Sequence, residues 1–104
     1  MKFNSQICTT REQSERLLSL GLKKETADMY WTKPFGDWIA IVGSGGILDE
    51  DNIPAWSLHR LIEIVSHTQY PYYVISKELP IYDALCERIE WLIKEGYFNK
   101  EYLV

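Results

Sequence analysis

The chain has 104 residues, 46% of them hydrophobic, which is enough to fold as one domain spanning residues 1–104 and too apolar for a disordered chain. Its formal net charge is −4, and its second half is acidic, with five Lys or Arg against ten Asp or Glu in residues 49–104, so we expect no nucleic-acid binding. No apolar run approaches the roughly 20 residues of a membrane span, and the first residues lack the apolar core of a signal peptide, so we expect a cytoplasmic protein that binds no membrane.

The first predicted helix begins at residue 9 or 10. Thr9 is followed three residues later by Glu12, and Thr10 by Gln13, so either register forms the pattern of a capping box. Gly21 ends the helix, because glycine adopts the left-handed conformation of a helix C-terminus without a Cβ clash.

Two strands joined by a turn are predicted next. Apolar and polar residues alternate over residues 26–32, which is typical of a half-buried strand. Residues 33–37 contain proline and glycine and form the turn. Residues 38–42 are a short apolar run rich in β-branched side chains, and we predict that they complete a hairpin.

The glycine-rich segment 43–52 follows the second strand. A strand that leads into Gly-x-Gly-Gly resembles a phosphate loop, but the three acids at 49–51 would repel a phosphate, and Pro54 leaves no room for a helix. The acids could bind a hard cation, but their spacing is not that of an EF-hand. We prefer a flexible, solvated loop. The alternative is a small-ligand site formed by Gly43, Gly45, Gly46, Asp49, Asp51 and His59.

The second half is predicted to contain a helix, a strand and a final helix. Ser57 is the expected N-cap of the first of these helices, with Pro54 as an alternative start. Residues 72–77 have high β-propensity and form the third predicted strand. The inward residues of the first helix are Leu58, Leu61, Ile62 and Val65.

The final helix begins at Pro80 and ends at Gly96. Glu90 precedes Lys94 by four residues, the favourable order for an ion pair. The tail, residues 98–104, is too apolar to stay in solvent, so we expect it to pack on the core. The apolar seam of this helix consists of Ile81, Leu85, Ile89 and Leu92.

These elements predict an α+β fold in the order α-β-β-α-β-α. Its three-stranded sheet, mixed or antiparallel, is covered by helices on one face.

The sequence contains no recognisable catalytic constellation. Cys8 and Cys86 are interpreted as reduced core thiols, and His59 and His67 have no metal-ligand spacing with other residues. We therefore expect no enzymatic activity, no metal and no cofactor.

Aromatic residues are abundant, with four Trp and seven Tyr. Exposed aromatic side chains are common anchors of protein interfaces, although a small core can also use large side chains. The candidate interaction residues are Trp38, Trp56, Tyr70, Tyr72 and Trp91.

Three stretches of the sequence are distinctive together. They are ICTTREQSERLL at 7–18 running on to TADM at 26–29, IPAWSL at 53–58, and IEWLIKEGYFNKEYL at 89–103. They resemble a group of small uncharacterised proteins of gut-dwelling anaerobic bacteria, often encoded on prophages or conjugative elements, from which residues 32–52 depart. This resemblance implies a mobile-element accessory protein and carries no activity, cofactor or catalytic residue.

The leading functional hypothesis is a non-enzymatic protein-interaction module with a protein partner or a second copy of itself as a homodimer. The second is a small-ligand binder or modest enzyme that uses residues 43–52 with His59. The third is an acidic mimic that inhibits a basic or DNA-binding protein.

Overall fold

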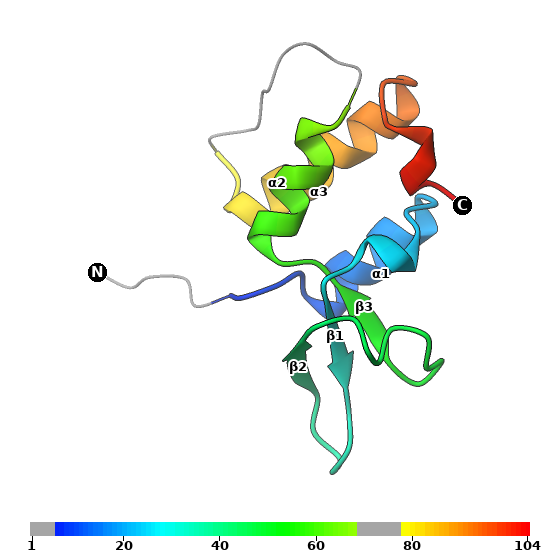
Figure 1. The fold of residues 1–104 in the computed structure, drawn as a ribbon. Coiled ribbons are helices and arrows are strands. Elements are labelled where there is room, and N and C mark those ends of the chain that lie inside the picture. Colours follow the sequence, from blue (N-terminus) through cyan, green and yellow to red (C-terminus); the bar gives the residue numbers. More distant parts are fainter. Residues whose placement is uncertain (1–5, 69–77) are drawn as a thin grey trace.

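A central strand, β1 (Met29–Thr32), organises the sheet in the computed structural model, which describes residues 6–68 and 78–104 (Figure 1). β2 (Ile39–Val42) and β3 (Ile53–Ala55) pair with β1 on either side, so the strand order is β2-β1-β3 and both pairings are antiparallel. The predicted hairpin is confirmed. Its first strand is shorter than residues 26–32 because the chain first makes a 3₁₀ turn, η1 (Lys24–Thr26).

The third strand of the described sheet was not predicted. β3 contains Pro54, which the sequence offers as an alternative helix start, whereas in the structure it pairs with Tyr30 of β1. A proline without an N–H is tolerated there because β3 is an edge strand of the sheet that the described residues form. The predicted α+β fold with a three-stranded sheet is confirmed, but the described order is α-β-β-β-α-α, so the predicted order α-β-β-α-β-α is wrong for these residues. The strand predicted at 72–77 lies outside the described residues.

The first helix, α1 (Arg11–Ser19), begins as a capping box predicts. Oγ1 of Thr10 accepts from the backbone N–H of Gln13 (3.1 Å), and Oε1 of Gln13 accepts from the backbone N–H of Thr10 (2.9 Å). At its other end Gly21 has φ 99°, and the N–H of Leu22 donates to O of Leu17 (3.2 Å). The chain thus leaves α1 through a Schellman turn that buries Leu22.

The other two helices, α2 (Leu58–Ser66) and α3 (Ile81–Lys94), pack against each other, and α3 also contacts α1 (Figure 1). Most of their predicted inward residues are buried. Leu58 is half-buried, Ile62 and Ile81 are each 39% exposed, and Ile64 is buried in place of Ile62. A spacing of three or four residues tolerates either choice, so which residue faces inward is decided by the neighbouring helix.

The C-terminal tail packs on the core as predicted. Phe98 is buried, and a short 3₁₀ helix, η2 (Lys100–Tyr102), follows it. Leu103 forms an antiparallel bridge with Leu22, and the N–H of Lys23 donates to O of Tyr102 (2.8 Å). The last residues are therefore fixed to the turn that follows α1.

The two faces of the sheet are covered differently. Met29, with Trp31 and Ala40 beside it, packs against buried Cys8 on one face. Tyr30 belongs to the other face and packs against the main core, which lies among the three helices and includes Trp56. In the described part of the chain, no helix combines the length and apolar character needed to cross a membrane.

Candidate functional site

The glycine-rich segment 43–52 crosses the sheet as an ordered connection. Gly46 lies on the ring of Tyr30, so close that an added Cβ would be 2.5 Å from a ring carbon. Nδ2 of Asn52 donates to O of Gly46 (3.0 Å), and the side chain of Ile47 is buried in the core. The segment is hydrogen-bonded and anchored, in contrast to the flexible loop that we predicted. Gly46 allows close packing on an aromatic ring, which is a structural role.

The acidic residues of this segment do not meet His59. Oδ1 of Asp49 accepts from the backbone N–H of Asp51 (3.0 Å), so this carboxylate closes a local turn. His59 lies on α2, where its Nε2 is 3.3 Å from Oε1 of Glu63. Across residues 6–68 and 78–104, no group of three or more His, Cys, Asp or Glu side chains is placed to hold a metal ion.

A small pocket of about 210 Å³ borders the crossing segment. Its lining residues are Glu25, Ser44, Ile47 and Leu48. None of the six residues of the predicted ligand site lines this pocket, so the structure gives no support to that alternative.

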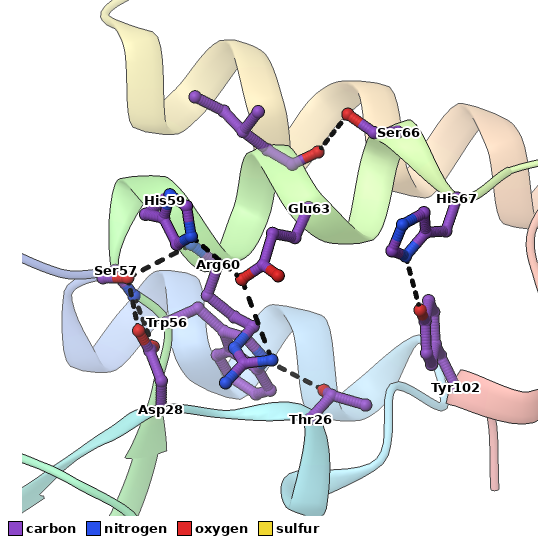
Figure 2. A network of polar contacts seen from close by, with 11 residues as sticks. Thr26, Asp28, Trp56, Ser57, His59, Arg60, Glu63, Ser66, His67 and Tyr102 are labelled. Atoms are coloured by element: carbon purple, nitrogen blue, oxygen red, sulfur yellow. Dashed lines mark hydrogen bonds and ion pairs between the residues drawn. The ribbon is translucent and has the colours of Figure 1, made fainter.

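A polar network fixes the start of α2 (Figure 2). Oδ1 of Asp28 accepts from the backbone N–H of Ser57 (2.9 Å), and Oδ2 accepts from its hydroxyl. The same hydroxyl oxygen accepts from the backbone N–H of Arg60 (3.2 Å), which makes Ser57 the N-cap that the sequence predicts. Asp28 thereby joins the start of β1 to α2.

A second pocket, of about 260 Å³, lies between α2, η1 and η2. Nδ1 of His67 and the hydroxyl of Tyr102 are 3.0 Å apart at one side, as Figure 2 shows. Oγ1 of Thr26 donates to O of Lys23 (2.7 Å), so its proton is already used. The pocket offers hydrogen bonds to a small polar molecule and no activated nucleophile. Its lining residues are Glu25, Thr26, Arg60, Glu63, Ile64, His67 and Tyr102.

No pattern in the sequence indicates this second pocket. His67 was considered only as a metal ligand, and Tyr102 only as part of an apolar tail. The two residues are 35 positions apart, and the return of the tail to the turn after α1 brings them together. A contact of this kind leaves no periodic signal in a sequence.

The predicted interaction residues differ in exposure. Trp56 is fully buried, and its Nε1 donates to Oγ1 of Thr26 (2.9 Å), so its assignment to an exposed surface is wrong. Trp38 is half-buried, and Trp91 is 37% exposed. Tyr70 and Tyr72 lie outside the described residues.

Cations contact both of the partly exposed tryptophans. The Arg11 guanidinium is 5.0 Å from the centre of the Trp38 ring, and Nζ of Lys33 is 5.7 Å from it. Arg88 lies 4.5 Å from the centre of the Trp91 ring. These contacts hold each indole ring in one orientation.

The two cysteines are unpaired and buried. Burial raises the pKa of the Cys8 thiol to about 11, with a further contribution from Asp28, and burial likewise raises that of Cys86 to about 11. A neutral, enclosed thiol is a poor nucleophile, so neither cysteine is placed for catalysis.

The free edge of β2 is the most accessible apolar feature of the sheet. Within the described residues β2 pairs only with β1, and no residue from 38 to 42 is charged. Val42 is 81% exposed, and Phe35, in the hairpin turn, is 94% exposed. Edge strands are usually protected by charged residues, proline or a bulge. β2 contains neither a charged residue nor a proline.

One hydrogen bond just beyond the end of β2 shows which of its residues direct their backbone groups toward β1 and which direct them outward. The N–H of Gly43 donates to O of Asp28 (2.9 Å), and the β1–β2 register continues through this pair. Because hydrogen-bonded pairs alternate in antiparallel strands, Ile41 and Ile39 also turn their backbone groups toward β1. The N–H and C=O groups of Ala40 and Val42 therefore point away from the sheet.

No protein-family model, curated protein or solved structure matches this chain.

Proposed function

We propose that this protein is a non-enzymatic protein-interaction module that binds its partner by adding a strand at the β2 edge. The observation that carries the proposal is the phase of β2, in which Ala40 and Val42 present their backbone groups outward along an uncharged strand. Such an edge is a template for a further strand, because backbone hydrogen bonds supply affinity and neighbouring side chains supply specificity. Phe35 adds an exposed aromatic side chain at the end of the same hairpin.

The proposal places the protein in the cytoplasm. Both cysteines are buried, unpaired thiols, the state that a reducing compartment maintains. A role as an accessory protein of a mobile element is part of the same proposal and comes from the sequence resemblance alone.

Acidic mimicry has less support than strand addition. Glu90 is paired with Arg16 and Lys94, and Glu63 with Arg60, so these carboxylates are partly neutralised by neighbours on the protein. A mimic of nucleic acid needs unpaired carboxylates that together resemble a row of phosphates.

Site-specific photo-cross-linking tests the proposal. A benzophenone amino acid at Phe35 replaces one aromatic side chain by another at a fully accessible position beside the edge. In lysate of the source organism we expect one defined cross-linked product. Introducing Val42→Lys should remove it, because a lysine on an edge strand blocks pairing.

Leu48→Lys is the matched control for this experiment. Leu48 is also an exposed apolar residue, 71% accessible, but it lies in the crossing segment and not in β2. The cross-linked product should survive Leu48→Lys. A product that survives Val42→Lys, or the absence of any product, would contradict strand addition at this edge.

A further inference from the structure

We infer that the strand added at the β2 edge is β2 of a second copy of this chain, arranged about a two-fold axis at Ala40. The inference rests on the proposed function and names its partner. Three features of the strand lead to it: its backbone phase, its apolar composition and the place where it ends.

The backbone phase allows self-pairing. A two-fold axis perpendicular to the sheet makes two β2 strands antiparallel and keeps each face of one sheet continuous with the same face of the other. In that arrangement Ala40 stands opposite Ala40 of the second copy. Since the N–H and C=O of Ala40 point outward, the two alanines can exchange both backbone hydrogen bonds, as a hydrogen-bonded antiparallel pair does.

The place where β2 ends selects this register. An axis at Ala40 sets Val42 opposite Trp38 and Ile39 opposite Ile41. The paired residues are then those of β2 together with Trp38, which directly precedes it. Moving the axis to Ile41 would set Ile39 opposite Gly43. Gly43 has φ 111°, so it is not extended and cannot continue the ladder. The register about Ala40 keeps every paired residue before this bend. An axis at Ile39 would instead set Val42 opposite Gly36 of the hairpin turn, which has φ 95° and is not extended either.

The side chains match one another in this register. Each cross-strand pair joins apolar residues, and Val42 with Trp38 is a pairing of a β-branched and an aromatic side chain, which strands favour. No charged residue lies between 38 and 42, so no charge stands within the paired strands, although Arg11 and Lys33 contact Trp38 at each end of the shared edge. Val42, 81% exposed in the single copy, gains a neighbour on pairing.

The strength of the proposed β2–β2 dimer can be measured as a dissociation constant. A contact of a few residues per copy is small for a protein interface, so we expect a monomer–dimer equilibrium between about 10 µM and 1 mM. Analytical ultracentrifugation over this range should show dimer formation by the unaltered chain. Val42→Lys should raise the dissociation constant about tenfold or more, and Leu48→Lys should leave it unchanged.

Disulfide trapping tests the register. In Ala40→Cys the new thiols of the two copies face each other across the axis, within the Cα separation of about 5.5 Å that a disulfide spans. Mild oxidation should yield a covalent dimer at protein concentrations near the dissociation constant. In Val42→Cys the two thiols lie four residues apart along the ladder, roughly 13 Å, and should not join. Cys8 and Cys86 are buried and do not compete.

The outcomes separate this inference from the proposed function. A chain that stays monomeric up to 1 mM overturns the inference, while a cross-linked partner at Phe35 that is lost in Val42→Lys would still support strand addition by another protein. A dimer that is insensitive to Val42→Lys, or that joins at position 42 and not at 40, overturns the inference as well. Circular dichroism of each variant confirms that its fold is retained.

Discussion

Thr9 and Trp56, 47 residues apart in the sequence, are joined by two hydrogen bonds. The backbone N–H of Thr9 donates to O of Trp56 (2.9 Å), and the backbone N–H of Trp56 donates to Oγ1 of Thr9 (3.0 Å). Both residues are fully buried. Nε1 of Trp31 also donates to O of Thr9 (2.9 Å), so this residue connects the start of α1, the sheet and the entry to α2.

Thr9→Val should destabilise the protein by about 1–3 kcal/mol. Valine keeps the volume of threonine but leaves the buried N–H of Trp56, and the hydroxyl of buried Ser14 beside it, without their partner. Urea unfolding followed by tryptophan fluorescence measures the change.

Thr32→Val is the control for that substitution. Thr32 ends β1, and within the described residues its side chain forms no hydrogen bond. Because valine is favoured in strands, the free energy of unfolding should change by less than about 0.5 kcal/mol. Equal effects of the two substitutions would mean that the hydrogen bonds of Thr9 contribute nothing specific.

Gly46→Ala should also destabilise the fold, by about 1–3 kcal/mol. The added methyl would lie 2.5 Å from the Tyr30 ring and 2.8 Å from Nδ2 of Asn52, so the crossing segment or the ring must shift. Gly45→Ala, its neighbour, meets no atom within 4 Å and should be nearly neutral. Thermal unfolding of the two variants measures the difference, and a neutral Gly46→Ala would show that the segment is not held against the sheet.

Local signals in the sequence predicted most of the fold. The capping box of Thr10, the N-cap Ser57 and the glycines that end the first and last helices each act within a few residues, so the sequence shows them directly. The hairpin was predictable for the same reason, because its turn lies between two short apolar runs.

The remaining features depend on contacts between distant segments. Pro54 argues against a strand in the sequence, and only its place at the edge, paired with Tyr30, permits one. Four tryptophans in so short a chain favour an exposed position for Trp56, but Oγ1 of Thr26 accepts the hydrogen bond of its Nε1–H, so the ring can be fully buried. The open edge of β2 depends on strand order, which no single segment encodes.

The cysteines should be unreactive in the folded protein at neutral pH. Burial raises the pKa of each thiol from the ordinary 9.0 to about 11, so both stay protonated and enclosed. With an aromatic disulfide reagent at pH 7.5 we expect two thiols per chain to react in denaturant and neither to react at comparable rate in buffer. Fast reaction of Cys8 in the native protein would contradict its burial and reopen a catalytic role.

The same raised pKa values make stability decline in alkali. The unfolded chain loses these protons near pH 9 and the folded chain near pH 11, so the folded state holds more protons in this interval. The contribution is fully present below pH 9 and is lost as the pH rises toward 11. Urea midpoints between pH 8 and pH 10.5 should fall, and replacing Cys86 by alanine should make the fall shallower.

Acid should weaken the contact between α1 and α3 through Glu90. The hydrogen bonds from Arg16 and Lys94 lower the pKa of the Glu90 carboxyl, and the charges of both cations add to the effect. A carboxyl whose pKa is lowered by folding contributes stability above its ordinary pKa, and this contribution is lost as the pH falls through the folded value. The urea midpoint should therefore drop below about pH 4.5.

Glu90→Gln isolates this effect, because glutamine keeps the shape of the side chain and removes its titration. The variant should be less stable than the unaltered chain at pH 7 and should lose less stability between pH 6 and pH 3. Glu95→Gln is the matched control, since Glu95 is exposed at the C-cap of the same helix and forms no ion pair within residues 6–68 and 78–104. It should reproduce the acid sensitivity of the unaltered chain. If both variants have the same pH profile, the pairing of Glu90 with Arg16 does not link the two helices, and the acid dependence arises from the general charge of the domain.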